Sequence, residues 1–104
     1  MGLFSFLKGK PKADLVQLMR DGAKLVDVRT KGEYSEGHAK GTSNVPLPEI
    51  PTKAKAWKKD EAIILCCRSG MRSGAAVSQL KQMGFTNVHN AGSWNKMQNL
   101  IQQK

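Results

Sequence analysis

Blocks of apolar residues recur along the chain, and each block has the period of one kind of secondary structure. The clearest is residues 62–66, AIILC, a continuous apolar run with β-branched residues at its centre. Such runs are typical of a parallel strand that is covered on both faces. Similar but shorter patterns predict strands at 25–28, 44–46 and 86–89. Helical spacing and capping residues predict helices from Asp14 to Gly22, near 53–58, at 73–83 and at 94–101, with a helical turn at 30–35.

The predicted strands and helices alternate along the chain. This order favours an α/β domain with a mainly parallel central sheet, flanked by helices on both faces. A chain of 104 residues, 39% of them apolar, suits one small domain. We expect that domain to span residues 13–104, with residues 1–12 as a flexible basic leader. Pro48 and Pro51 predict an irregular crossing before the helix near 53–58.

The chain is strongly basic, with 17 Lys and Arg residues against eight Asp and Glu residues and a formal net charge of +9. A basic chain raises the question of nucleic-acid binding. However, the lysines are spread along the sequence, and no nucleic-acid motif or aromatic ladder accompanies them. We therefore expect no specific nucleic-acid partner, and a solvated basic surface that steers small anions toward a site.

The sequence contains no apolar run of transmembrane length, so we expect no stable membrane insertion. The apolar patch near the N-terminus is too short for a secretory segment. This pattern predicts a cytoplasmic protein. A weak contact of Leu3, Phe4, Phe6 and Leu7 with a membrane surface remains an alternative interpretation of the leader.

The two cysteines, Cys66 and Cys67, are adjacent, so they cannot form a disulfide framework. No Cys/His spacing predicts a metal site, and we expect none. Because strand side chains alternate, Cys66 should belong to the strand and pack against the sheet as a small buried hydrophobe. A role as a resolving thiol is the less favoured alternative, because a vicinal disulfide closes a strained ring.

Cys67 follows the strongest predicted strand and precedes a helix, and ligands of open α/β sheets bind at such strand ends. Unpaired N–H groups at a helix N-terminus attract anions, and Gly70 allows the backbone to turn with positive φ. Arg68 and Arg72 add positive charge. Together these features predict that Cys67 is a stabilised thiolate and a nucleophile.

The spacing from Cys67 to Arg72 is C-x4-R, and position 73 holds a serine. Cysteine phosphatases use C-x5-R to encircle a phosphate. A ring that is one residue shorter suits a single extra sulfur atom on the cysteine better than a phosphoryl group.

The loop sequence CRSGMRS resembles the active-site loop of single-domain rhodaneses, the thiosulfate-type sulfurtransferases. From about Asp14 onward, further segments resemble that family in order and spacing: 26–29 (VDVR), 33–38 (EYSEGH), Gly41, 44–46 (NVP), 83–88 (MGFTNV) and 91–92 (AG). Departures fall at Ala39, Thr42, Ser93 and Met97, positions that concern packing rather than the loop.

The resemblance implies that the thiolate of Cys67 attacks the outer sulfur of a donor such as thiosulfate and becomes a persulfide, while sulfite leaves. The loop would bind the small anionic donor and the persulfide through Arg68, Ser69, Gly70, Met71, Arg72 and Ser73. Asp27 and Arg29 would brace the loop from a strand end. A small thiol, cyanide or a protein cysteine would then accept the sulfur. We expect no cofactor, and a monomer.

Other classes of function remain open at this point. A persulfide carrier, loaded by a protein partner with little turnover of thiosulfate, is the main alternative. A phosphatase or arsenate reductase is disfavoured by the length of the loop. A nucleic-acid-binding protein would require steeply salt-dependent retention on RNA or DNA.

Overall fold

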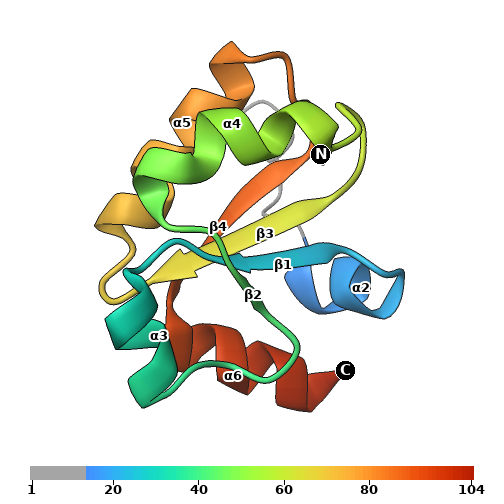
Figure 1. Cartoon of the computed structure of the whole chain (residues 1–104). Helices are drawn as coiled ribbons and strands as arrows, with labels where there is room; N and C mark the ends of the chain where they lie inside the picture. Colours follow the sequence, from blue (N-terminus) through green and yellow to red (C-terminus); the bar gives the residue numbers. More distant parts are fainter. Residues whose placement is uncertain (1–13) are drawn as a thin grey trace, which may run out of the picture.

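A computed structural model describes residues 14–104, and it confirms the α/β fold with one parallel sheet. The strands are β1 (Lys24–Asp27), β2 (Ser43–Asn44), β3 (Ile63–Cys67) and β4 (Val88–Ser93), in the order β2-β1-β3-β4 (Figure 1). All three pairings are parallel. The α-helices are α2 (Leu15–Arg20), α3 (Lys31–Glu36), α4 (Ile50–Lys53), α5 (Met71–Gln82) and α6 (Trp94–Gln103).

Helices cover both faces of the sheet, as the sequence predicts, with α4 and α5 on one face and α2 and α6 on the other (Figure 1). Every residue of β3 is buried. Because its side chains alternate, Ile63, Leu65 and Cys67 join the core beneath α4 and α5. Ile64 and Cys66 join the core beneath α2 and α6. The two cysteines therefore point to opposite faces of the sheet.

Local capping explains where two of the helices end or begin. The carboxylate of Asp14 accepts a hydrogen bond from Gln17 N–H at 3.1 Å and caps α2. At the end of α5, Gly84 takes a φ of +101°, and Phe85 N–H donates to Leu80 C=O at 3.0 Å. This is the Schellman arrangement, with Phe85 buried against the helix.

Several predicted boundaries were wrong, including that of β2, which covers Ser43–Asn44 rather than 44–46. The helix predicted near 53–58 and the irregular crossing predicted at Pro48 and Pro51 are replaced by three consecutive short helical segments, a 3-10 helix at Leu47–Glu49, α4 and a 3-10 helix at Ala54–Ala56. Both prolines fit there because they occupy first-turn positions where no amide donor is required. Helix α5 begins at Met71 rather than 73. Strand β4 extends from 88 to 93 rather than 86 to 89. Because α5 starts earlier and β4 ends later than predicted, both elements reach the loop after Cys67.

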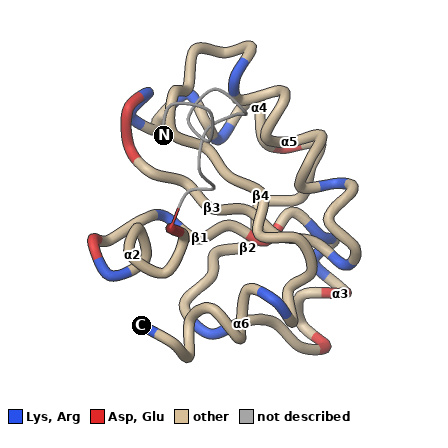
Figure 2. The backbone as a smooth tube through the Cα atoms, turned by 180° about the vertical axis from the view of Figure 1, so that it is seen from behind, with Lys and Arg blue, Asp and Glu red and all other residues tan. Residues whose placement is uncertain are grey.

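Two further observations concern the part of the chain that the structure describes. None of its helices has the length and apolar character needed to cross a membrane. Lys and Arg positions recur on most of its elements (Figure 2). The predicted leader, residues 1–12, lies outside the described residues.

Candidate active site

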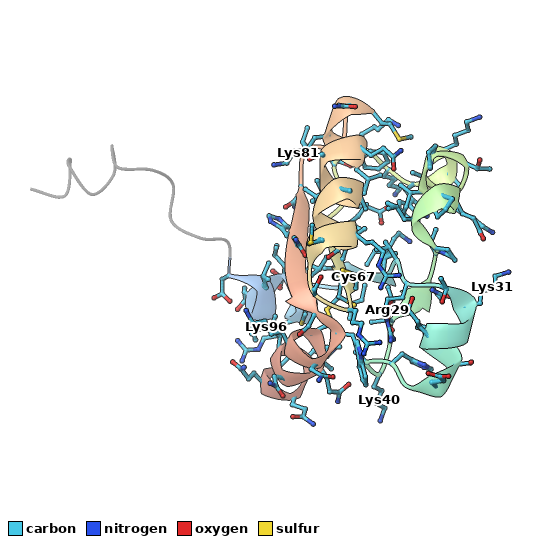
Figure 3. All side chains as sticks on the ribbon, turned by 90° about the vertical axis from the view of Figure 1, so that its left-hand side faces the viewer. Arg29, Lys31, Lys40, Cys67, Lys81 and Lys96 are labelled. Carbon is cyan, nitrogen blue, oxygen red and sulfur yellow. The ribbon has the colours of Figure 1, made fainter. Side chains whose placement is uncertain are left out.

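Cys67 is the last residue of β3 and lies at the carboxyl edge of the sheet, directly before the loop that leads into α5. Figure 3 shows it within the protein, while Lys31, Lys40, Lys81 and Lys96 lie toward the periphery. Its exposed fraction is 0%. The sulfur therefore lies beneath the loop and not on the outer surface.

The neighbouring thiol, Cys66, is also fully buried, but it faces the other layer of helices. Burial, followed by the negative charge of Asp27, raises the pKa of the Cys66 thiol to about 12. At neutral pH this sulfur is protonated and unreactive. The prediction that Cys66 packs against the sheet is confirmed.

The loop after Cys67 turns its backbone back over the sulfur atom. Gly70 has a φ of +101°, and its N–H donates to the Sγ of Cys67 at 3.0 Å. Gly70 also packs against Gly92 of β4 so closely that a Cβ at this position would lie 3.2 Å from the Gly92 Cα. Both the conformation and the space therefore require glycine here.

Ser73, in the first turn of α5, supplies a second donor to the same sulfur. Its hydroxyl lies 3.4 Å from the Sγ of Cys67, and Ser73 is fully buried. Burial raises the pKa of the Cys67 thiol. Hydrogen bonds from the Ser73 hydroxyl and from the N–H groups of Ser73, Gly70 and Ser69 outweigh that effect, so the net pKa is lower than its ordinary value. These groups stabilise a thiolate.

Asn90, on β4, links both of these groups. Its Nδ2 donates to Gly70 C=O at 2.8 Å, and its Oδ1 accepts from the Ser73 hydroxyl at 2.7 Å and from Gly92 N–H at 2.9 Å. The sequence analysis missed this residue. It lies 17 positions from Ser73, and no local pattern distinguishes it from the other asparagines.

Asp27 and Arg29 form a buried ion pair, at 2.8 Å between Nη2 and Oδ2, beside Cys66 rather than beside Cys67. The Arg29 guanidinium also donates to Gly37 C=O at 2.7 Å and to Glu33 C=O at 3.3 Å, and lies over the Trp94 ring at 4.9 Å. This arginine thus ties β1 to α3 and α6.

Arg72 is held by Glu33 of α3 through two hydrogen bonds, of 2.7 and 3.0 Å. The Arg72 guanidinium, followed by the Thr30 N–H, holds the pKa of the Glu33 carboxyl well below its usual range. Glu33 also completes a capping box with Thr30 at the start of α3. The positive charge of Arg72 is therefore paired, and α3 connects the loop to the Asp27–Arg29 pair.

The remaining loop side chains lie at the surface. Arg68 and Ser69 are exposed, and Met71 is the large apolar side chain exposed in the described part of the chain, at 81%. Arg68 lines a cavity of about 440 Å³ together with Arg29, Glu33, Glu36, Gly37, Trp94 and Asn95. Cys67 does not line this polar cavity, and Arg68, its neighbour in the sequence, connects the cavity to the loop.

Comparison with known proteins identifies the family to which this loop and fold belong. A sequence profile described as "Rhodanese-like domain" matches residues 12–100. The chain belongs to the rhodanese-like domain family. A relative is the thiosulfate sulfurtransferase PspE of Escherichia coli, 35% identical over 69 residues, which are 64% of this chain and 66% of that protein.

Two further similarities are informative. The putative sulfur carrier protein YrkF of Bacillus subtilis is 35% identical over 66 residues, which cover 64% of this chain and 36% of that protein. The solved structure of a rhodanese with anions from E. coli has a TM-score of 0.67 at 34% identity, covering 72% of this chain and 91% of that chain. The chain spans less than two thirds of the length of these two curated relatives.

Within this rhodanese-like domain, the structure brings together most residues that the sequence singled out. Gly70 and Ser73 contact the sulfur of Cys67, and Arg68 lines the adjacent cavity. Arg72 turns to Glu33, a partner that the sequence analysis did not foresee. No cluster of three or more potential metal ligands occurs in residues 14–104.

If thiosulfate loads Cys67 with sulfur, Gly70→Ala is expected to slow that loading by about tenfold to a hundredfold, the effect of losing one hydrogen bond to a charged group. The added Cβ meets Gly92, and the positive φ is strained for alanine, so the N–H is withdrawn from the Cys67 sulfur. The measurement is the rate of mass gain with thiosulfate. The matched control is Gly22→Ala, which has a similar φ of +96° but nothing within 4 Å of its Cβ. Equal loading rates in the two variants would contradict the prediction.

Proposed function

We propose that this protein is a sulfurtransferase in which Cys67 carries the sulfur. The thiolate of Cys67 attacks the outer sulfur of thiosulfate or a similar donor, a new S–S bond forms, and the donor's S–S bond breaks. Sulfite leaves with the bonding electron pair, and Cys67 is left as a persulfide anion. The observation that carries the proposal is the Sγ of Cys67, which receives hydrogen bonds from Gly70 N–H and the Ser73 hydroxyl.

The second half of the cycle returns the sulfur to an acceptor. A small thiol, cyanide or a protein cysteine attacks the outer sulfur of the persulfide and regenerates the Cys67 thiolate. In this proposal the amide groups of the loop hold the persulfide sulfur, because they already point toward the position of Cys67 Sγ. Because Cys67 is buried, the added sulfur atom would lie beneath the loop, close to these amide groups.

The two loop arginines have different roles in this mechanism. Arg68 is exposed at the cavity and binds the oxyanion end of the donor. Arg72 is already paired with Glu33, so it mainly fixes the start of α5 and adds positive potential near the sulfur. In this mechanism one loop arginine, Arg68, is therefore available to bind thiosulfate, rather than two.

A persulfide carrier is a second candidate. The name of YrkF, a putative sulfur carrier protein, supports it, and so does a net charge of +9, which suits an acidic protein partner. In that case a partner protein loads Cys67, and thiosulfate is a poor donor.

The test is the intact mass of the protein after treatment with thiosulfate in the absence of reductant. We expect a gain of one sulfur atom that cyanide removes. Sulfite should appear in equal amount, because the attack releases one sulfite for each persulfide formed. No mass gain in folded protein would overturn the use of thiosulfate. Loading by a persulfidated donor protein, followed by transfer to a small thiol, would then distinguish the carrier from an inactive domain.

A further inference from the structure

The side chain of Asn90 contacts two of the residues that donate hydrogen bonds to the sulfur of Cys67, Gly70 and Ser73. Its Nδ2 is fixed by Gly70 C=O, at 2.8 Å, and its Oδ1 is fixed by Gly92 N–H, at 2.9 Å. Rotating the amide by 180° would place donor against donor and acceptor against acceptor at these two contacts. The side-chain oxygen of Asn90 is therefore held toward Ser73, although the residue itself lies at the exposed edge of the sheet.

The Ser73 hydroxyl has two partners but one proton. Its oxygen lies 2.7 Å from Asn90 Oδ1 and 3.4 Å from Cys67 Sγ, and both of those atoms accept hydrogen bonds. While Cys67 is a thiol, the hydroxyl donates to Asn90. When Cys67 is a thiolate, the same proton is drawn toward the sulfur, and Asn90 Oδ1 keeps the Gly92 N–H. Asn90 thus competes with the sulfur for the Ser73 proton.

The contact with Gly70 acts on the sulfur by a second route. Gly70 has a left-handed backbone, with a φ of +101°, and it lies on an exposed loop. Its C=O is anchored by Asn90, and its N–H points at Cys67 Sγ at 3.0 Å. Because these two groups belong to one residue, a side chain that fixes the carbonyl also limits the direction of the N–H.

We propose that Asn90 is a positioning residue for sulfur transfer, acting on the Cys67 sulfur through the Gly70 N–H and the Ser73 hydroxyl. It does not touch the reacting atoms. It sets the number and the direction of the hydrogen bonds that the sulfur receives before and after it gains the second sulfur atom. The proposal about transfer rests on the proposed function, whereas its effect on the Cys67 thiolate does not.

Asn90→Asp is the first test. The new carboxylate places a negative charge near the sulfur, holds the Ser73 proton and repels the Gly70 carbonyl. We expect the pH midpoint of the rate of Cys67 alkylation by iodoacetamide to rise by about one unit, so alkylation slows by about tenfold at pH values well below that midpoint. Asn99→Asp is the matched control, because it makes the same change of charge at an exposed position of α6. That control should keep the wild-type profile.

Asn90→Ala and Ser73→Ala, alone and combined, test the two routes without adding charge. We expect Asn90→Ala to slow sulfur loading about tenfold through the Gly70 route, and to have a larger effect when Ser73 is already alanine, because the Ser73 proton that Asn90→Ala releases to the sulfur, which opposes the slowing, is then absent. If Asn90→Ala slowed loading by the same factor with and without Ser73→Ala, the Ser73 route would be overturned. The whole proposal would be overturned if both Asn90 variants stayed within twofold of wild type in their alkylation rates across the pH profile and in their loading rates.

The alkylation profile separates this proposal from the proposed function. If wild-type protein gains no sulfur from thiosulfate, the sulfurtransferase assignment fails, but the shift in the Asn90→Asp profile can still be measured. If the protein gains sulfur and Asn90 variants match wild type in both measurements, the positioning role alone fails.

Discussion

Cys67→Ala is expected to abolish both sulfur loading and alkylation of the protein at pH 7, whereas Cys66→Ala retains both. The two substitutions remove the same atom from opposite faces of β3. Burial raises the pKa of Cys66 to about 12, whereas hydrogen bonds lower that of Cys67, so the thiolate that forms near neutral pH belongs to Cys67. The measurement is the rate of iodoacetamide addition between pH 5 and pH 9, with the mass gain from thiosulfate measured in parallel.

The lowered pKa of Cys67 also determines how its alkylation rate changes with pH. Because the pKa of Cys67 is lowered, its thiolate forms at a lower pH than that of an ordinary cysteine, and the rate rises earlier with pH. Alkylation of Cys66→Ala should follow the wild-type curve. If Cys67→Ala still gained a cyanide-removable sulfur while Cys66→Ala lost it, the assignment of the nucleophile would be reversed.

The opposite placement of the two cysteines could be predicted from sequence, because alternation along a strand is a local property. The apolar run at 62–66 defined β3, and the next residue had to lie at the carboxyl edge of a parallel sheet. Gly70 could be predicted for a similar reason, since a tight return of the backbone over a sulfur atom needs positive φ.

The polar partners of the loop could not be predicted, because they come from distant parts of the chain. Arg72 and Glu33 are separated by 39 positions, and Ser73 and Asn90 by 17. The loop sequence alone predicts that Arg72, like Arg68, faces the donor anion, and it contains no signal for a carboxylate partner. In the folded protein α3 lies next to the loop and supplies a carboxylate.

The support of the loop by Asp27 and Arg29 stays a prediction, and the contacts that would carry it run through α3. Asp27 and Arg29 contact each other, Arg29 donates to the carbonyl groups of Glu33 and Gly37, and Glu33 in turn holds Arg72. The buried pair at the end of β1 thus contacts α3, and α3 contacts the loop after Cys67. Local sequence suggested the pair, whereas the route from the pair to the loop depends on tertiary packing.

Asp27→Ala is therefore expected to lower the free energy of unfolding by about 3–5 kcal/mol, the usual cost of removing one partner of a buried ion pair. The substitution leaves the Arg29 guanidinium, only 4% exposed, without the carboxylate that accepts from its Nε and Nη2. The measurement is denaturant unfolding followed by circular dichroism. Asp60→Ala is the control, because it removes the same charge from an exposed position and should change stability by less than about 0.5 kcal/mol.

A second variant distinguishes the pair from simple packing. Replacing Asp27 by leucine and Arg29 by methionine together removes both charges, so neither is left buried alone, and stability should recover part of the loss. The position of the loop should not recover together with stability, because methionine cannot donate to the Glu33 and Gly37 carbonyls. We expect this double variant to fold but to load sulfur more slowly than wild type. A double variant as unstable as Asp27→Ala would show that the site depends on packing rather than on compensation of charge.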